Sequence, residues 1–170
     1  MNIRQEQKDD YAAVYNVVKT AFETAEKSDG NEAELVEVLR KSNSYIPELS
    51  LVAVENGRIV GHILFTKAYV GEHVVLALAP LSVLPKYQRK GIGFALIREG
   101  HRIAKNMGFD YSVVLGHPSY YPKSGYTPAS IYGIKAPFDV PDESFMAVKL
   151  NDCAKYIEGV IKYDEAFGTD

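Results

Sequence analysis

The chain has a single cysteine, Cys153, among its 170 residues. One cysteine cannot form an internal disulfide, and it excludes a multi-cysteine metal cluster. No uninterrupted apolar run reaches the roughly eighteen residues that suggest a membrane-spanning helix, and no charged-then-apolar signal segment opens the chain. Low-complexity linkers and internal repeats are also missing. These absences predict a cytoplasmic protein with no membrane partner and no metal site.

Excess positive charge is missing as well. Nineteen lysines and arginines against 22 aspartates and glutamates give a net charge of −3. No basic stretch is broad enough to follow a phosphate backbone, so nucleic acid is not expected as a partner. Hydrophobic residues make up 46% of the chain, which is enough to bury one core. We therefore expect a single domain over residues 1–170.

The most informative segment passes from an apolar strand through a short basic loop into a helix that opens with glycines. The strand, Val74–Val83, is too apolar to be half solvated and is expected near the centre of a sheet. Pro80 cannot donate to a ladder and should mark a bulge or a break in pairing. The loop Gln88–Gly93 then exposes N–H groups at a helix start, which favours binding of a phosphate or diphosphate. The apolar stripe of the helix is predicted at Ile92, Leu96, Gly100, Ile103 and Met107.

The spacing of the glycines decides which phosphate loop this is. No window supplies the Walker pattern G-x-x-x-x-G-K-[ST]. The dinucleotide pattern G-x-G-x-x-G/A fails because Leu96 takes the third small position. What remains, Q-x-x-G-x-G from Gln88 to Gly93, resembles the acetyl-coenzyme A loop of the GCN5-related N-acetyltransferases, [QR]-x-x-G-x-[GA]. The alternative is an ordinary strand–helix connection whose glycines only shape the turn.

This resemblance implies acetyl-coenzyme A (acetyl-CoA) as cosubstrate, with its diphosphate held by the loop amides. In the family the fourth strand is bulged and splays from the fifth, so its freed backbone groups pair with the pantetheine arm and face the thioester. The cosubstrate-binding residues implied for this chain are Leu81, Ser82, Val83, Gln88, Arg89, Lys90, Gly91, Ile92 and Gly93. Loop lysines and arginines are usually solvated, so side-chain contacts to the phosphates stay open.

A second family pattern, Y-x-x-x-G-[FY], follows the expected strand Tyr111–Leu115 and matches Tyr121, Gly125 and Tyr126. In many members this tyrosine protonates the departing coenzyme A thiolate, so Tyr121 is the candidate general acid. Tyr120 is the rival, because neighbours on an extended segment point in opposite directions. The alternative interpretation is that both tyrosines are only packing and capping aromatics. The compact G-x-P-x-Y-Y loop departs from the commonest family form and is similar to a branch of predicted bacterial N-acetyltransferases.

The order of the expected elements extends the resemblance over roughly residues 1–130. Asn56-Gly57 between two apolar runs predicts a tight hairpin. The helix between Val74–Val83 and Tyr111–Leu115 predicts a parallel strand pair. Residues 131–170 are expected to add C-terminal strands.

The resemblance thus implies an α/β (α+β) fold. Its central sheet is mixed and mainly antiparallel, it is flanked by helices, and a splayed strand pair forms the acyl-CoA cleft.

The implied activity is that of an N-acetyltransferase. It would move an acetyl group from acetyl-CoA to a primary amine of a small molecule or a protein, by direct attack on the thioester. A non-catalytic acyl-CoA-binding or regulatory protein is the alternative, but such a protein needs no proton donor at the sulfur. The general base is left open among Glu32, Glu34, His62, Glu72 and a water chain. The acceptor amine and a possible homodimer are also left open.

Overall fold

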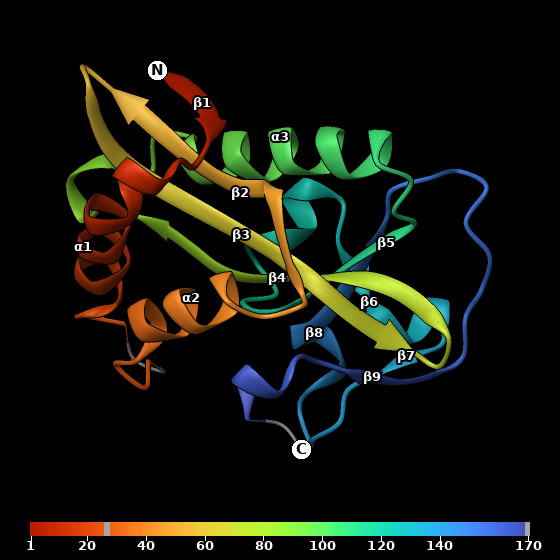
Figure 1. Cartoon of the computed structure of the whole chain (residues 1–170). Helices are drawn as coiled ribbons and strands as arrows, with labels where there is room; N and C mark the ends of the chain where they lie inside the picture. The colour runs from red at the N-terminus through yellow and green to blue at the C-terminus, as the bar shows by residue number, and fades with distance from the viewer. Residues whose placement is uncertain (26–27, 169–170) are drawn as a thin grey trace.

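The protein is built on a twisted sheet with the strand order β1-β2-β3-β4-β5-β8-β6. The computed structural model describes residues 1–25 and 28–168. Helices α1 and α2 pack on one face of the sheet and α3 lies on the other (Figure 1). The strands are β1 (Asn2–Gln5), β2 (Tyr45–Glu55), β3 (Arg58–Val70), β4 (His73–Val83), β5 (Tyr111–Leu115), β6 (Thr127–Pro128), β7 (Ile134–Lys135), β8 (Phe145–Lys149) and β9 (Gly159–Lys162).

The helices are α1 (Tyr11–Phe22), α2 (Glu32–Arg40) and α3 (Ile92–Asn106), with short 3₁₀ helices η1 (Lys8–Asp10), η2 (Pro85–Tyr87), η3 (Tyr121–Ser124), η4 (Ala129–Tyr132), η5 (Asp142–Ser144) and η6 (Glu165–Phe167). Strands β1 to β4 pair antiparallel, β5 runs parallel to β4, and β8 is antiparallel to β5. The mixed, mostly antiparallel sheet flanked by helices confirms the predicted fold class. The C-terminal strands join this sheet, because β9 pairs with the end of β3.

Local turn chemistry explains the hairpin between β2 and β3. Asn56 and Gly57 both have positive φ, 52° and 77°. That pair of conformations is what a two-residue hairpin turn requires, and asparagine and glycine adopt it at little cost. The predicted hairpin is confirmed.

Helix α3 follows the predicted loop, and its buried face is rotated relative to the predicted stripe. Its buried residues are Ile92, Gly93, Leu96, Ile97, Gly100 and Ala104. Met107 is 42% exposed, so its assignment to the core was wrong, because the helix has ended at Asn106. Gly100 lets α3 approach β3, since a Cβ there would overlap the ring of Phe65.

Strand β4 carries the bulge predicted at Pro80. Ile63 pairs with Leu81 and Phe65 with Leu78, so Ala79 and Pro80 together stand opposite one residue of β3. Beyond this point β4 also loses its other neighbour. The β4–β5 ladder consists of Leu76↔Ser112 and Ala77↔Val113, whereas β4 continues to Val83. The two strands therefore splay, as predicted.

A buried ion pair ties the end of α2 to the segment after β1. Arg40 donates to both carboxylate oxygens of Glu6 at 2.9 and 2.8 Å, and the two side chains are 8% and 0% exposed. His62 Nε2 lies 3.0 Å from Ser50 Oγ and 3.4 Å from the Glu6 carboxylate. The carboxylate is thus neutralised inside the core.

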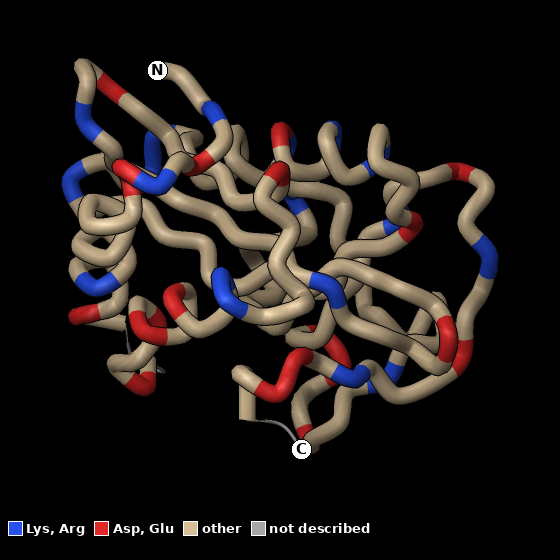
Figure 2. The backbone as a smooth tube through the Cα atoms, viewed as in Figure 1, with Lys and Arg blue, Asp and Glu red and all other residues tan. Residues whose placement is uncertain are grey.

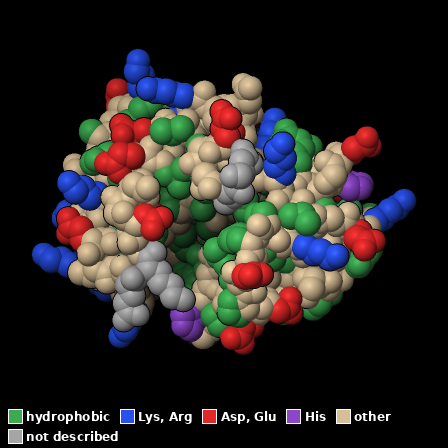
Figure 3. All heavy atoms as spheres, turned by 90° about the horizontal axis from the view of Figure 1, so that it is seen from below, with side chains coloured by type: hydrophobic (Ala, Val, Ile, Leu, Met, Phe, Trp, Pro, Cys, Tyr) green, Lys and Arg blue, Asp and Glu red, His purple; other side chains and the backbone are tan. Residues whose placement is uncertain are grey.

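The surface carries charges of both signs. Figure 2 shows lysines and arginines interspersed with aspartates and glutamates along the chain. Seen from below, hydrophobic side chains line a hollow in the surface (Figure 3). Within residues 1–25 and 28–168, none of the helices is long and apolar enough to span a membrane. The same residues contain no group of three or more histidine, cysteine or acidic side chains placed to hold a metal ion.

Candidate active site

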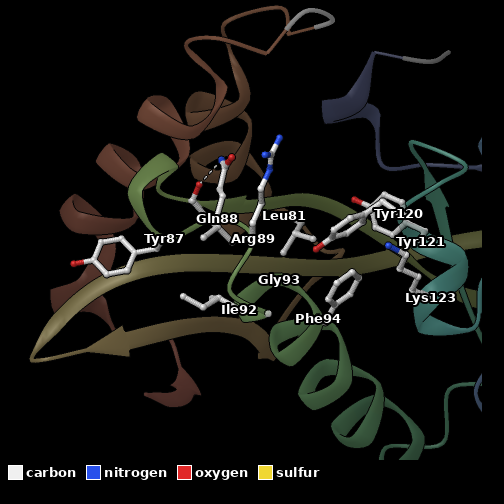
Figure 4. A pocket seen from close by; sticks show the side chains of 12 residues that line it. Leu81, Tyr87, Gln88, Arg89, Ile92, Gly93, Phe94, Tyr120, Tyr121 and Lys123 are labelled. Atoms are coloured by element: carbon white, nitrogen blue, oxygen red, sulfur yellow. Dashed lines mark hydrogen bonds between the residues drawn. The ribbon is translucent and has the colours of Figure 1, made fainter.

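A cavity of about 540 Å³ opens beside the end of β4, between the loop that enters α3 and the segment that follows β5 (Figure 4). Its walls come from two stretches of chain, residues 81–94 and residues 120–123. They are formed by Leu81, Val83, Tyr87, Gln88, Arg89, Gly91, Ile92, Gly93, Phe94, Tyr120, Tyr121 and Lys123. The structure therefore brings together the predicted loop, the splayed strand and both tyrosines.

Two of the predicted cosubstrate residues do not line this cavity. Ser82 is buried on the opposite side of β4, and its hydroxyl has no hydrogen-bond partner among the described residues. The Lys90 ammonium lies 5.5 Å from the centre of the Tyr87 ring instead. Ser82 differs from Leu81 and Val83 because successive side chains along a strand point to opposite faces of the sheet.

The backbone of β4 presents hydrogen-bonding groups to the cavity at alternate residues. Leu84 N–H donates to Val60 O of β3 at 2.9 Å. The backbone N–H and C=O groups of successive residues point to opposite edges of a strand. Those of Ser82 therefore point toward β3, like the N–H of Leu84, whereas those of Leu81 and Val83 point to the side from which β5 has splayed. The Val83 carbonyl accepts a hydrogen bond from Gln88 Nε2 at 2.9 Å. The N–H groups of Leu81 and Val83 are left facing the gap.

The loop before α3 reverses direction through two left-handed residues, Arg89 at φ 62° and Gly91 at φ 85°. Gln88 N–H is used inside the loop, where it donates to Pro85 O at 3.3 Å. The first helical bond of α3 runs from Ala95 N–H to Gly91 O at 3.0 Å, and no side chain caps the helix. The N–H groups of residues 91 to 94 therefore have no acceptor within the helix.

These free amides form the positive end of a helix of fifteen residues. Arg89 of the loop before α3 and Lys123 of η3 add positive charge to the same cavity (Figure 4). Such an arrangement suits a diphosphate better than a neutral ligand. Phe94 and Lys123 were not among the predicted residues, because Phe94 follows the loop motif and Lys123 occupies a variable position of the Y-x-x-x-G-[FY] pattern.

Tyr121 is held in place by its contacts behind the cavity. Its ring lies against Gly116, where a Cβ would overlap Tyr121 Cε2 and stand 2.8 Å from Cδ2. On its other side Tyr126 packs edge-on, with ring centres 5.7 Å apart. Tyr126 is itself anchored, because its hydroxyl lies 2.8 Å from Ser112 Oγ and 3.0 Å from His101 Nε2. Burial raises the pKa of the Tyr121 hydroxyl, so this phenol keeps its proton at neutral pH.

None of the four candidate bases lines the cavity. His62 is fully buried and its pKa is lowered to about 3, first by burial and then by the nearby Arg40 charge. A neutral histidine inside the ion-pair network fits a structural role. Glu32 accepts a hydrogen bond from Ser28, Glu34 accepts one from Tyr15, and Glu72 lies in the turn between β3 and β4. The base stays unassigned.

Comparison with known proteins relates this architecture to one family. The model of the acetyltransferase (GNAT) family matches residues 11–126. An uncharacterized N-acetyltransferase of Escherichia coli K12, YjhQ, is 45% identical over 117 residues, which are 66% of this chain and 65% of YjhQ. A second uncharacterized N-acetyltransferase of that strain, YhbS, is 29% identical over 98% of both chains.

Solved structures agree with this relationship over almost the whole chain. The crystal structure of Escherichia coli YhbS in complex with CoA has a TM-score of 0.89 at 26% identity, covering 98% of this chain and 91% of YhbS. A GNAT family acetyltransferase of Brucella melitensis in complex with acetyl-CoA has a TM-score of 0.82 at 31% identity, covering 98% and 97%. The GNAT family uses acetyl-CoA as its cosubstrate. With its family-model match and full-length structural likeness, this chain belongs to the acetyltransferase (GNAT) family.

Proposed function

We propose that this protein is an N-acetyltransferase that transfers the acetyl group of acetyl-CoA to a primary amine. The observation that carries the proposal is one cavity that combines the uncapped start of α3, the free N–H groups of Leu81 and Val83, and the protonated phenol of Tyr121. The CoA and acetyl-CoA complexes of the related YhbS and Brucella proteins support the same cosubstrate. A cytoplasmic location and a homodimer stay predictions.

The residues of the cavity fit a cosubstrate that has an anionic end and a long, amide-containing arm. The amides of residues 91 to 94 would bind the diphosphate, with Arg89 and Lys123 near its charge. The Leu81 and Val83 N–H groups would donate to acceptors of the pantetheine arm, which takes the place of a missing neighbouring strand. Gln88 holds the end of β4 in place through the Val83 carbonyl.

Bound acetyl-CoA supplies an acetyl group that is activated as a thioester. Of the two free N–H groups of β4, those of Leu81 and Val83, the one that faces the thioester rather than an amide of the arm would stabilise the negative charge that develops on the carbonyl oxygen. As the amine nitrogen bonds to the carbonyl carbon and the carbon–sulfur bond breaks, Tyr121 would donate its proton to the sulfur. The amine would lose its own proton to solvent or to a base not yet assigned. Holding both reactants in register contributes further to the rate.

The activity is tested by free-thiol release from acetyl-CoA in the presence of polyamines, amino acids, aminoglycosides or peptide N-termini. Each acceptor is compared with the same reaction without an amine, which measures hydrolysis alone. Acceptor-dependent release, with the acetylated amine identified by mass, is the expected result. A protein that binds acetyl-CoA but acetylates no amine in the panel would support the alternative of a non-catalytic acyl-CoA-binding protein.

Acetyl-CoA is expected to stabilise the fold. At a free concentration one hundredfold above its dissociation constant, it should raise the free energy of unfolding by about 2.7 kcal/mol. Thermal or urea unfolding with and without ligand measures this change. The absence of any shift at millimolar acetyl-CoA would contradict the proposed cosubstrate.

Replacing Gly91 by valine should remove that ligand-dependent stabilisation. Gly91 has φ 85° and lines the cavity, and a Cβ added there would have no protein atom within 4 Å. The larger side chain should therefore occupy space that the ligand needs. Gly108 is a matched control, because it has φ 91° at the other end of α3 and is equally free of neighbours. Both variants should lose stability by about 1–2 kcal/mol for the left-handed conformation. Only Gly91→Val should lose the acetyl-CoA shift, and equal shifts in the two variants would count against the α3 site.

A further inference from the structure

We propose that the Tyr120 hydroxyl binds the cosubstrate by donating a hydrogen bond to its diphosphate, at the point where the cavity meets the first turn of α3. The two adjacent tyrosines would then have different roles: Tyr120 would donate a hydrogen bond to the diphosphate, and Tyr121 would donate a proton to the sulfur. This inference rests on the proposed function, because it assumes that the cavity takes acetyl-CoA.

The ring of Tyr120 is fixed by aromatic neighbours on both sides. It stacks on Phe94 of α3, with ring centres 4.7 Å apart and an angle of 17° between the planes. The Tyr121 ring meets it edge-on at 5.0 Å and 82°. Figure 4 shows both tyrosines entering the cavity from the segment after β5, on the side of Leu81 and Gly93. The orientation of the Tyr120 hydroxyl is therefore set before any ligand binds.

The hydroxyl oxygen of Tyr120 is seated directly on Gly93. A Cβ at Gly93 would overlap this oxygen, whereas the ring carbon Cζ that carries it would stand 3.5 Å away. Gly93 is the second residue of α3, and its N–H is one of the amides without a helical acceptor. The phenol and the free amides of the helix start thus face the same small volume.

The environment of this hydroxyl favours an anionic partner. No hydrogen bond found among the described residues involves the Tyr120 hydroxyl, so this donor is available to a ligand in the cavity. Arg89 and Lys123 line the same cavity. Burial raises the pKa of Tyr120, so its O–H stays a donor at neutral and mildly alkaline pH. A donor beside a helix N-terminus and two cations suits a phosphate oxygen.

Tyr121 packs in a different environment, so the two phenols are not interchangeable. Its ring carbons, rather than its hydroxyl, lie against Gly116. It also packs edge-on against Tyr126, whose hydroxyl is anchored by Ser112. Of these two neighbouring tyrosines, Tyr120 therefore places its hydroxyl at the start of α3, whereas Tyr121 packs its ring against Gly116 and Tyr126.

Isothermal titration with CoA and with its nucleotide half, 3′-phosphoadenosine 5′-diphosphate, tests the inference on the intact protein. Tyr120→Phe should weaken both ligands about tenfold or more, the range for a hydrogen bond to a charged group. Tyr121→Phe should weaken them far less. In steady-state kinetics Tyr120→Phe should act mainly through the KM for acetyl-CoA, and Tyr121→Phe mainly through kcat.

Three outcomes would overturn the inference without touching the proposed function. These are equal affinities in Tyr120→Phe and the parent protein, a loss for CoA but not for the nucleotide half, and a fall in kcat without a change in KM. A parent protein that binds neither ligand would instead reject the proposed function.

Two double variants test the contact between the Tyr120 hydroxyl and Gly93 by thermal unfolding. Gly93→Ala should lower the melting temperature, and Tyr120→Phe should restore it in the double variant, because only the hydroxyl oxygen blocks the new methyl group. In the matched pair, Tyr121→Phe should not rescue Gly116→Ala, because the ring carbons remain in the way. Equal recovery of the melting temperature in both pairs, or recovery in neither, would contradict the contact between the Tyr120 hydroxyl and Gly93.

Discussion

Replacing Tyr121 by phenylalanine is expected to lower kcat by about 10²–10⁴-fold, because the leaving thiolate loses its proton donor. The aromatic ring stays on Gly116 and Tyr126, so the shape of the cavity is kept and only the O–H is removed. The measurement is steady-state thiol release at saturating acetyl-CoA, with a pre-steady-state experiment to establish that chemistry limits the rate. Unchanged turnover under that condition would reject Tyr121 as the acid.

The pH profile gives an independent check on this role. Because burial raises the pKa of Tyr121, the phenol stays protonated, and active as an acid, through the alkaline range in which an exposed tyrosine begins to ionise. The parent enzyme should therefore show no alkaline loss of kcat near the ordinary tyrosine pKa. Tyr69→Phe, at an exposed position on β3, is the control for a tyrosine remote from the cavity. An alkaline fall near pH 10 that Tyr121→Phe abolishes would contradict the buried environment.

Replacing Arg40 by alanine is expected to reduce the free energy of unfolding by about 3–5 kcal/mol, the usual cost of leaving a buried charge unpaired. Arg40 supplies both hydrogen bonds that neutralise the fully buried Glu6 carboxylate. The neutral His62 3.4 Å away cannot replace that positive charge. Urea unfolding measures the difference.

The chain provides a matched control for this change. Arg4 makes the same two-pronged contact with Asp10, at 2.7 and 3.0 Å, but the Arg4 side chain is 38% exposed. Arg4→Ala should therefore cost about 0–1 kcal/mol. The double variant Glu6→Gln/Arg40→Met, which removes both charges, should be less destabilised than Arg40→Ala. Similar losses in all three variants would mean that burial of the Glu6 charge is not what makes the pair important.

The predictions that held depend on rules that act over a few neighbouring residues. The Asn56-Gly57 turn, the Pro80 bulge and the glycine-opened start of α3 follow from backbone conformations that particular residues favour or forbid. The errors arose where the angular position of a side chain mattered. Met107 was assigned to the buried stripe by extending the helical spacing beyond Asn106, where α3 ends, and it is exposed.

The site shows the same division between local and long-range information. All residues of the motif Gln88–Gly93 except Lys90 line the cavity, whereas Ser82 of the preceding strand does not. The sequence alone does not tell which way each of these side chains points. Phe94 and Lys123 line the cavity although neither is a position that a motif specifies. Whether the predicted residues bind the cosubstrate stays a prediction that the experiments above test.

The sequence by itself determined the order of the elements, the bulge at Pro80 and the glycine-opened start of α3, because turn residues and hydrophobic periodicity act locally. The splay of β4 from β5 was implied by the family resemblance. Only the tertiary structure decided which groups meet. The hydroxyl of Tyr120 rests on Gly93, 27 positions earlier in the chain, and Glu6 pairs with Arg40 across 34 positions. Such contacts depend on how helices and strands pack against one another, which no pattern within a single segment specifies.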